Sequence, residues 1–203
     1  MILDYDDTLL PTTYLDPADE GDMESLAKKH RKKLNAVQDQ VVALLEKFLN
    51  VSKVLIITNA KKGWVEYSSS ILLPKVHQTI MKYIPVISAR GEFESQFVNK
   101  ISEWKKQAFL ALWNIDDLLD RDAITNLIVI GDAQYEMDAG KSFQQSTDKC
   151  IAKQIKLRES PTADELEKQL SVVNREFDFI FSSVTSFNLK LEKGAHKSPQ
   201  SRK

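Results

Sequence analysis

The sequence predicts an α/β domain in which helices cover both faces of a doubly wound, Rossmann-like parallel sheet of about five to six strands. Short apolar runs that are continuous, rather than alternating in polarity, are typical of strands buried on both faces. These runs alternate with segments long enough for helices, which indicates βαβ units. Right-handed crossovers then place helices on both faces and give three layers. The expected strands are Met1–Leu3, Lys53–Ile57, Pro85–Ile87, Asn126–Ile130, Ile151–Leu157 and Phe177–Phe181.

Five helices are expected between these strands, because apolar residues recur there at helical spacing. The second should break at Pro74, since proline lacks an amide hydrogen and its ring clashes with the preceding turn. Thr162 and Glu165 have the spacing of a capping box at the start of the fifth. The helices are expected at about Met23–Asn50, Trp64–Tyr83 and Phe97–Ile115, after Asp132, and from about Pro161.

One domain is expected, over residues 1–189. A chain of 203 residues can bury a sizeable core. Hydrophobic residues make up 42% and charged residues 28%, which argues against wholesale disorder. Residues 190–203 are rich in Lys and Ser and have no apolar pattern, so they are predicted to form a flexible basic tail. Only three residues precede Asp4, which is short for a core strand, and we expect a few more apolar residues upstream in the natural protein.

The composition favours neither a membrane nor a nucleic acid as a partner. The formal net charge of −1 creates no global field toward either. No apolar run approaches the roughly 20 residues of a membrane span, and the first residues are acidic where a secretory signal is basic. Cys150 is the single cysteine, so no intrachain disulfide can form. This fits a reducing compartment, and we expect a cytoplasmic location.

Acidic residues follow two of the predicted strands, at the edge where parallel sheets bind ligands. Asp4 and Asp6 come directly after the first strand, and Gly131 and Asp132 end the fourth. Carboxylates that lie close together repel one another, and Mg²⁺, which prefers oxygen ligands, relieves that cost. Each segment taken alone is also typical of a turn or a helix cap.

A hydroxyl and a lysine accompany these carboxylates. Thr58 ends the second strand and could donate to a phosphate oxygen, although a strand-end cap is the commoner role. Lys105 or Lys106, on the helix before the fourth strand, could neutralise charge on a transferring phosphoryl group or simply face solvent. The joint pattern is more specific than its parts, because three strands in order each end in a residue type that phosphoryl transfer requires.

These residues resemble the four motifs of the haloacid dehalogenase (HAD) superfamily. The superfamily has an Asp-x-Asp-x-Thr loop, a strand-end Ser or Thr, a Lys or Arg, and an acidic Gly-Asp loop. The matching residues here are Asp4-Tyr5-Asp6-Asp7-Thr8, Thr58, Lys105 (or Lys106), and Gly131-Asp132. The strand–helix pattern extends the resemblance to about residue 182.

The resemblance implies a Mg²⁺-dependent phosphatase that acts on a phosphorylated small molecule or macromolecule. Asp4 would attack phosphorus and form an aspartyl-phosphate, and Asp6 would act as general acid and then as general base. Mg²⁺ would be bound by the Asp4 side chain, the Asp6 backbone carbonyl and Asp132. Thr58 and Lys105 would hold the phosphoryl oxygens. The superfamily's dehalogenases lack the second aspartate, so Asp6 favours phosphate chemistry.

The acidic loop departs from the superfamily pattern, which often places a second acid four or five residues after the first. The fourth residue after Asp132 is Glu136, which is therefore the expected additional acid near the metal.

The segment of residues 9–52 has room for a loop, the long helix and a small lid, but not for a full cap domain. A nearly capless enzyme is therefore expected, and its open site favours a macromolecular substrate or a lid supplied by a second subunit.

Other interpretations stay open at this point. The chain could be a non-catalytic HAD-like binding or scaffold module, although it keeps both aspartates of the first motif. A receiver domain of the response-regulator type also uses Asp, Thr, Lys and Mg²⁺, but its motifs come in a different order. The sequence does not separate a hydrolase from a phosphotransferase.

Trp64 is expected to be a packing residue.

Overall fold

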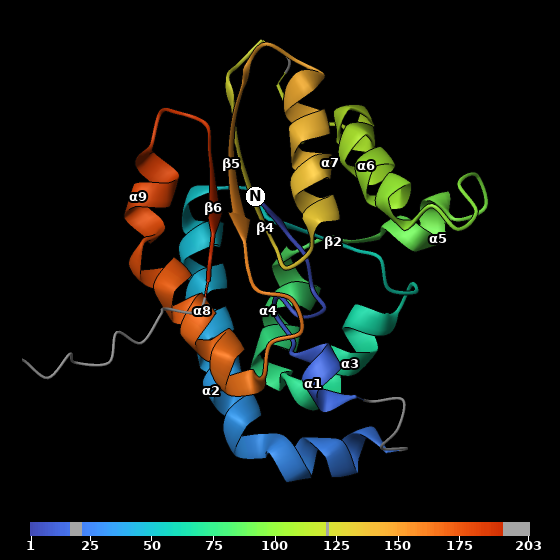
Figure 1. Cartoon of the computed structure of the whole chain (residues 1–203), viewed down its shortest axis with the longest axis vertical. Coiled ribbons are helices and arrows are strands. Elements are labelled where there is room, and N and C mark those ends of the chain that lie inside the picture. Colours follow the sequence, from blue (N-terminus) through green and yellow to red (C-terminus); the bar gives the residue numbers. More distant parts are fainter. Residues whose placement is uncertain (17–21, 121, 193–203) are drawn as a thin grey trace, which may run out of the picture.

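A computed structural model describes residues 1–16, 22–120 and 122–192 and has the predicted α/β architecture (Figure 1). The strands in these ranges form one parallel sheet in the order β3-β2-β1-β4-β5-β6. β1 therefore lies at the centre, between β2 and β4. The strands are β1 (Ile2–Leu3), β2 (Leu55–Thr58), β3 (Val86–Ser88), β4 (Thr125–Gly131), β5 (Cys150–Lys156) and β6 (Phe187–Lys190).

Helices connect these strands and cover both faces of the sheet, which confirms the three-layer arrangement (Figure 1). A 3₁₀ turn at Leu112–Asn114 follows α6. The helices are α1 (Thr12–Leu15), α2 (Met23–Val51), α3 (Trp64–Leu72), α4 (Pro74–Tyr83), α5 (Ala89–Phe93), α6 (Ile101–Ala111), α7 (Gln134–Gln145), α8 (Ala163–Arg175) and α9 (Phe177–Ser182).

The two faces of the sheet bury separate hydrophobic cores, because neighbouring residues of a strand point to opposite faces. Leu3 and Ile130 pack into a core formed with α2, α3, α4 and α8. Ile2 and Val129, one residue earlier in each strand, pack into a second core formed with α6 and α7. Strands buried on both faces explain why the sequence shows continuous apolar runs rather than alternation.

Local sequence rules correctly placed several helix ends. Pro74 ends the predicted second helix and becomes the first residue of α4. Thr162 caps α8, since its hydroxyl accepts from the Glu165 amide at 3.3 Å and Glu165 Oε2 accepts from the Thr162 amide at 3.1 Å. The predicted helix from Phe97 starts later, at Ile101, because Asn99 has a φ of 58° and lies in the left-handed region that interrupts a helix.

The prediction of a strand at Phe177–Phe181 is wrong. This segment forms α9, with Phe177 and Ile180 buried three residues apart, as a helix face requires. The sixth strand is Phe187–Lys190, an edge strand in which Asn188, Leu189 and Lys190 are exposed. An edge strand with a mostly exposed, polar sequence has no apolar run that would reveal it.

The predicted tail also begins too early. Lys190 pairs with Lys156 in the sheet, and the Leu191 amide donates to the Lys156 carbonyl at 2.9 Å. The sheet therefore continues past residue 189, the predicted end of the domain. The remainder of the predicted tail, residues 193–203, lies outside the described residues.

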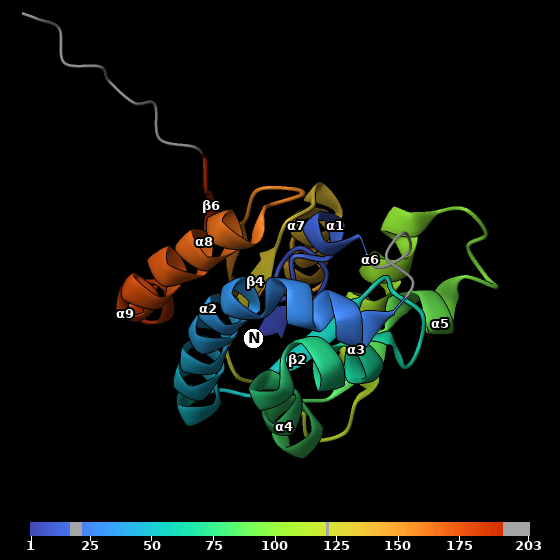
Figure 2. The ribbon, with the colours of Figure 1, turned by 90° about the horizontal axis from the view of Figure 1, so that it is seen from below.

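Two segments lie beside the carboxyl ends of the strands. Figure 1 and the view from below in Figure 2 show that α2 is bent, with its first part next to α1 and the rest running along one face of the sheet. Tyr14 of α1 contacts His30 of α2 edge to face, and its hydroxyl lies 3.4 Å from His30 Nδ1. The segment predicted to form a loop or small lid, about residues 9–22, contains α1, and its residues 17–21 lie outside the described ranges. No helix within those ranges is long and apolar enough to cross a membrane.

We predict that Thr162→Ala lowers the free energy of unfolding by about 1 kcal/mol, because it removes the cap of α8. Urea unfolding followed by circular dichroism measures the change. Thr79→Ala is the matched control, since Thr79 lies inside α4 and caps no helix. Its expected effect is within about 0.5 kcal/mol. Equal losses in both variants would contradict the capping role of Thr162.

Candidate active site

The predicted site residues meet at the carboxyl edge of three adjacent strands. Asp4 follows β1, Thr58 ends β2, and Asp132 follows β4. The Asp4 amide donates to the Ile130 carbonyl at 2.9 Å, which continues the pairing of β1 with β4. The sheet order changes direction between β1 and β4, and ligands bind at such switch points in open α/β sheets.

Lys105, rather than Lys106, is the lysine that enters this edge. Its side chain is 1% exposed, and Nζ donates to Asp4 Oδ1 and, at 2.5 Å, to Glu136 Oε1. Ala108 and Phe109, one turn further along α6, are buried on the same face of the helix. The Lys106 side chain is 41% exposed and forms an ion pair of 3.7 Å with Glu103.

The carboxylates exceed the positive charge at this edge. Asp4, Asp132 and Glu136 are buried close to the ammonium of Lys105. A second buried ammonium, that of Lys156, donates to the Asp132 backbone carbonyl at 2.6 Å and is paired with Glu159 at 2.9 Å. Burial raises the pKa of Asp4 to about 7; Lys105 opposes this effect and Glu136 adds to it. Burial and repulsion from Asp4 and Glu136 raise the pKa of Asp132 to about 8. Burial alone would lower the pKa of Lys105, but the attraction of Asp4 and Glu136 raises it.

Glu136 is fixed by contacts on both of its oxygens. Oε1 accepts from Lys105, and Oε2 accepts from the Ala133 amide at 2.8 Å. The side chain packs against Gly131, where an added Cβ would lie 2.6 Å from Glu136 Cγ. The φ of Gly131 is not positive, so no left-handed conformation requires a glycine here. The glycine instead leaves space for the buried glutamate.

Asp6 lies beside Asp4 but in a different environment. It is only partly buried. Its Oδ1 accepts from Thr12 Oγ1 at 2.6 Å and from Trp64 Nε1 at 2.9 Å, and its Oδ2 lies 3.5 Å from Thr58 Oγ1. The sequence assigned Trp64 to packing alone. The indole does border the core, but its N–H also orients Asp6, and no pattern in the sequence indicates this contact.

Asp7 shapes the loop that carries these aspartates. Its φ of 53° is left-handed, and its amide donates to the Leu10 carbonyl at 2.7 Å. Its carboxylate accepts from the Thr13 amide at 2.9 Å and from the Thr13 hydroxyl. Asp7 is buried, and burial raises its pKa. The loop and α1 are therefore joined by two Asp–Thr contacts, Asp6–Thr12 and Asp7–Thr13. No pattern in the sequence indicates these contacts of Asp7, Thr12 and Thr13.

Among the described residues, no group of three or more His, Cys, Asp or Glu side chains has the arrangement of a metal site. The Mg²⁺ site implied by the HAD resemblance uses two carboxylates, those of Asp4 and Asp132, with the backbone carbonyl of Asp6. Such a site has only two side-chain ligands and does not require a third. The excess of buried carboxylates over ammonium groups fits the binding of a divalent cation.

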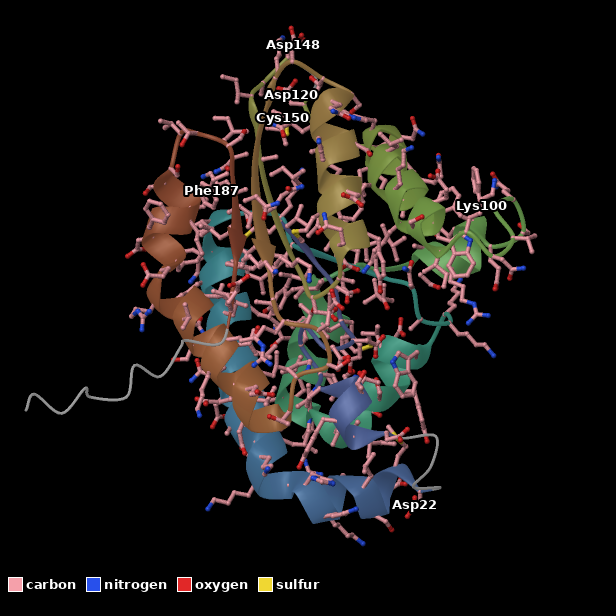
Figure 3. All side chains as sticks on the ribbon, in the orientation of Figure 1. Asp22, Lys100, Asp120, Asp148, Cys150 and Phe187 are labelled. Carbon is pink, nitrogen blue, oxygen red and sulfur yellow. The ribbon has the colours of Figure 1, made fainter. Side chains whose placement is uncertain are left out.

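The single cysteine lies far from this edge. Cys150 begins β5 and pairs with Thr125, the first residue of β4. Figure 3 shows it at the opposite end of the sheet, near Asp120 and Asp148. Cys150 therefore takes no part in the candidate site.

Comparisons with known proteins add no assignment: no protein-family model matches the chain, and no curated protein or solved structure shows significant similarity to it.

We predict that Lys105→Met lowers the free energy of unfolding by roughly 3–5 kcal/mol, because it leaves buried carboxylates without their cation. Lys106→Met removes an equivalent side chain from the exposed, neighbouring position, and its expected effect is below about 1 kcal/mol. Urea unfolding in metal-free buffer measures both. Similar losses in the two variants would rule out the buried network as the cause.

Proposed function

We propose that the protein is a Mg²⁺-dependent phosphatase of the HAD type that acts through an aspartyl-phosphate on Asp4. One observation carries the proposal. The buried Asp4 carboxylate lies at the switch point of the sheet in contact with Lys105, and the second aspartate of the loop, Asp6, lies beside the strand-end threonine Thr58. The four motif positions, far apart in the sequence, meet at this edge of the sheet.

Asp4 has the environment of an oriented nucleophile. Its Oδ1 is held by Lys105, which leaves Oδ2 for attack on phosphorus. The attacking carboxylate must be ionised, and the ammonium of Lys105 favours that form. Lys105 can also pair with a phosphoryl oxygen as charge moves during the transfer. The 6% exposure of Asp4 limits competition from bulk water.

Asp6 is suited to proton transfer because it is accessible and still oriented. Hydrogen bonds from Thr12 and Trp64 fix its Oδ1. Its Oδ2 faces Thr58, which would bind a phosphoryl oxygen through its hydroxyl. In this proposal Asp6 protonates the leaving oxygen and then takes a proton from the water that hydrolyses the aspartyl-phosphate.

The residues that would hold Mg²⁺ are Asp4 and Asp132, through their carboxylates, and Asp6, through its backbone carbonyl. When bound, the cation supplies positive charge that offsets repulsion between the carboxylates and the phosphate. Glu136 is held away from a direct ligand role, because both of its oxygens already accept hydrogen bonds. Its part is to position Lys105.

We predict that the wild type hydrolyses p-nitrophenyl phosphate only with Mg²⁺ and that Asp4→Asn lowers kcat at least 10³-fold, since the amide cannot form the covalent intermediate. Asp6→Asn should lower kcat by about 10²–10⁴-fold. The release of p-nitrophenol measures both. Asp138→Asn is the control, because Asp138 is an exposed carboxylate on α7, and it should keep wild-type activity.

A folded wild type that binds Mg²⁺ and turns over no phosphate ester would instead favour the non-catalytic binding module. Turnover that persists in Asp4→Asn would exclude Asp4 as the nucleophile.

We predict that Mg²⁺ at millimolar concentration raises the Tm of the wild type, because the cation binds the folded state alone. Asp132→Asn should abolish this increase, whereas Asp138→Asn should keep it. Differential scanning fluorimetry measures Tm independently of any activity. An equal Mg²⁺-dependent increase in the Asp132→Asn variant would place the cation elsewhere.

A further inference from the structure

Lys156, the last residue of β5, is a buried lysine that the proposed reaction does not use. β5 ends beside β4, where Lys156 pairs with Gly131 in the sheet (Figure 1). The side chain is 11% exposed, and its Nζ donates to the Asp132 backbone carbonyl at 2.6 Å and to Glu159 Oε1 at 2.9 Å. The lysine therefore connects β5 directly to the residue whose carboxylate would bind Mg²⁺.

The position of the Asp132 carboxylate depends on its backbone. Among the described residues, this carboxylate accepts only a long hydrogen bond of 3.5 Å, from Thr8 Oγ1. The backbone is held more firmly, at two successive carbonyls. That of Gly131 accepts from the Leu157 amide at 2.8 Å, and that of Asp132 accepts from Lys156. A metal ligand is placed accurately only when the groups that support it are themselves fixed.

The charge of Lys156 is costly at this place. An ammonium repels a nearby divalent cation, and burying an ammonium is unfavourable unless it is paired and hydrogen-bonded. Glu159 balances the charge, so the pair as a whole is neutral. An apolar side chain would fill the same space without either cost. What a lysine adds is a hydrogen bond from a charged donor to the Asp132 carbonyl, and such bonds are about twice as strong as neutral ones.

We propose that Lys156 is a positioning residue for Asp132. Its ammonium fixes the backbone of the metal ligand, and Glu159 holds the ammonium in place. The inference rests on the proposed function, in which Asp132 binds Mg²⁺. Removing a residue that orients a metal ligand typically lowers metal affinity or activity about 10–100-fold. The rate that is lost at low Mg²⁺ should therefore be recovered as the Mg²⁺ concentration is raised.

Isothermal titration calorimetry with Mg²⁺ alone tests the proposal without turnover. We expect Lys156→Met to weaken Mg²⁺ binding about 10–100-fold. The double variant Lys156→Met/Glu159→Gln removes the pair without changing the net charge, and it should weaken binding in the same way. Lys156→Arg keeps a cationic donor and should recover part of the lost affinity. If Lys156→Met fails to fold, Lys156→Gln replaces it, because its amide is one methylene too short to reach the Asp132 carbonyl.

Lys153→Met is the matched control for a merely structural loss. Lys153 lies three residues earlier in β5, is buried, and also donates to a backbone carbonyl, that of Phe181 in α9, at 2.7 Å. The control removes the same kind of hydrogen bond without touching the backbone of Asp132. It should lose stability in urea but bind Mg²⁺ as the wild type does.

Three results would overturn the proposal. Mg²⁺ binding that is unchanged or tighter in Lys156→Met would show that the ammonium does not position the ligand. An equal loss of affinity in Lys153→Met would assign the effect to general destabilisation. A raised KM for p-nitrophenyl phosphate in Lys156→Met, with unchanged Mg²⁺ affinity, would place the lysine on the substrate instead.

Hydrolysis of p-nitrophenyl phosphate by the wild type judges the phosphatase proposal separately. Mg²⁺-dependent hydrolysis by the wild type, with unaltered Mg²⁺ binding in Lys156→Met, would overturn the role of Lys156 alone. Weakened Mg²⁺ binding in Lys156→Met, with no ester hydrolysed by the wild type, would support the role of Lys156 and overturn the phosphatase. A folded wild type that binds no Mg²⁺ would overturn both.

Discussion

The buried ammonium of Lys105, held between Asp4 and Glu136, is the interaction on which the rest of the candidate site depends. It joins the end of β1 to α6 and α7. Burying a lone ammonium costs several kcal/mol, and burying the carboxylates alone costs as much, so each group requires the others. Gly131 belongs to the same constraint, because any side chain there would displace Glu136. The remaining excess of negative charge is the physical reason to expect a divalent cation at this edge.

The loop after β1 gives its two aspartates different environments. Asp4 is buried against Lys105, whereas Asp6 is partly exposed and accepts hydrogen bonds from Thr12 and Trp64. Environment, rather than residue type, sets the part that each of two neighbouring carboxylates can take. The left-handed Asp7 closes the loop and joins it to α1. The proposed division into nucleophile and proton-transfer group follows from this asymmetry.

The sequence by itself determined the α/β class, most strands, the break at Pro74 and the cap of α8, because these depend on local periodicity and on single-residue sterics. It also indicated that Asp4, Thr58 and Asp132 would share an edge, since parallel strands end together. Tertiary structure decided what depends on packing between distant segments. Neighbouring helix residues point in directions about 100° apart, so only the docking of α6 selects Lys105 over Lys106. Three other features also depend on neighbours that no local pattern specifies. They are the contact of Trp64 with Asp6, the space that Gly131 leaves for Glu136, and the helical state of Phe177–Phe181.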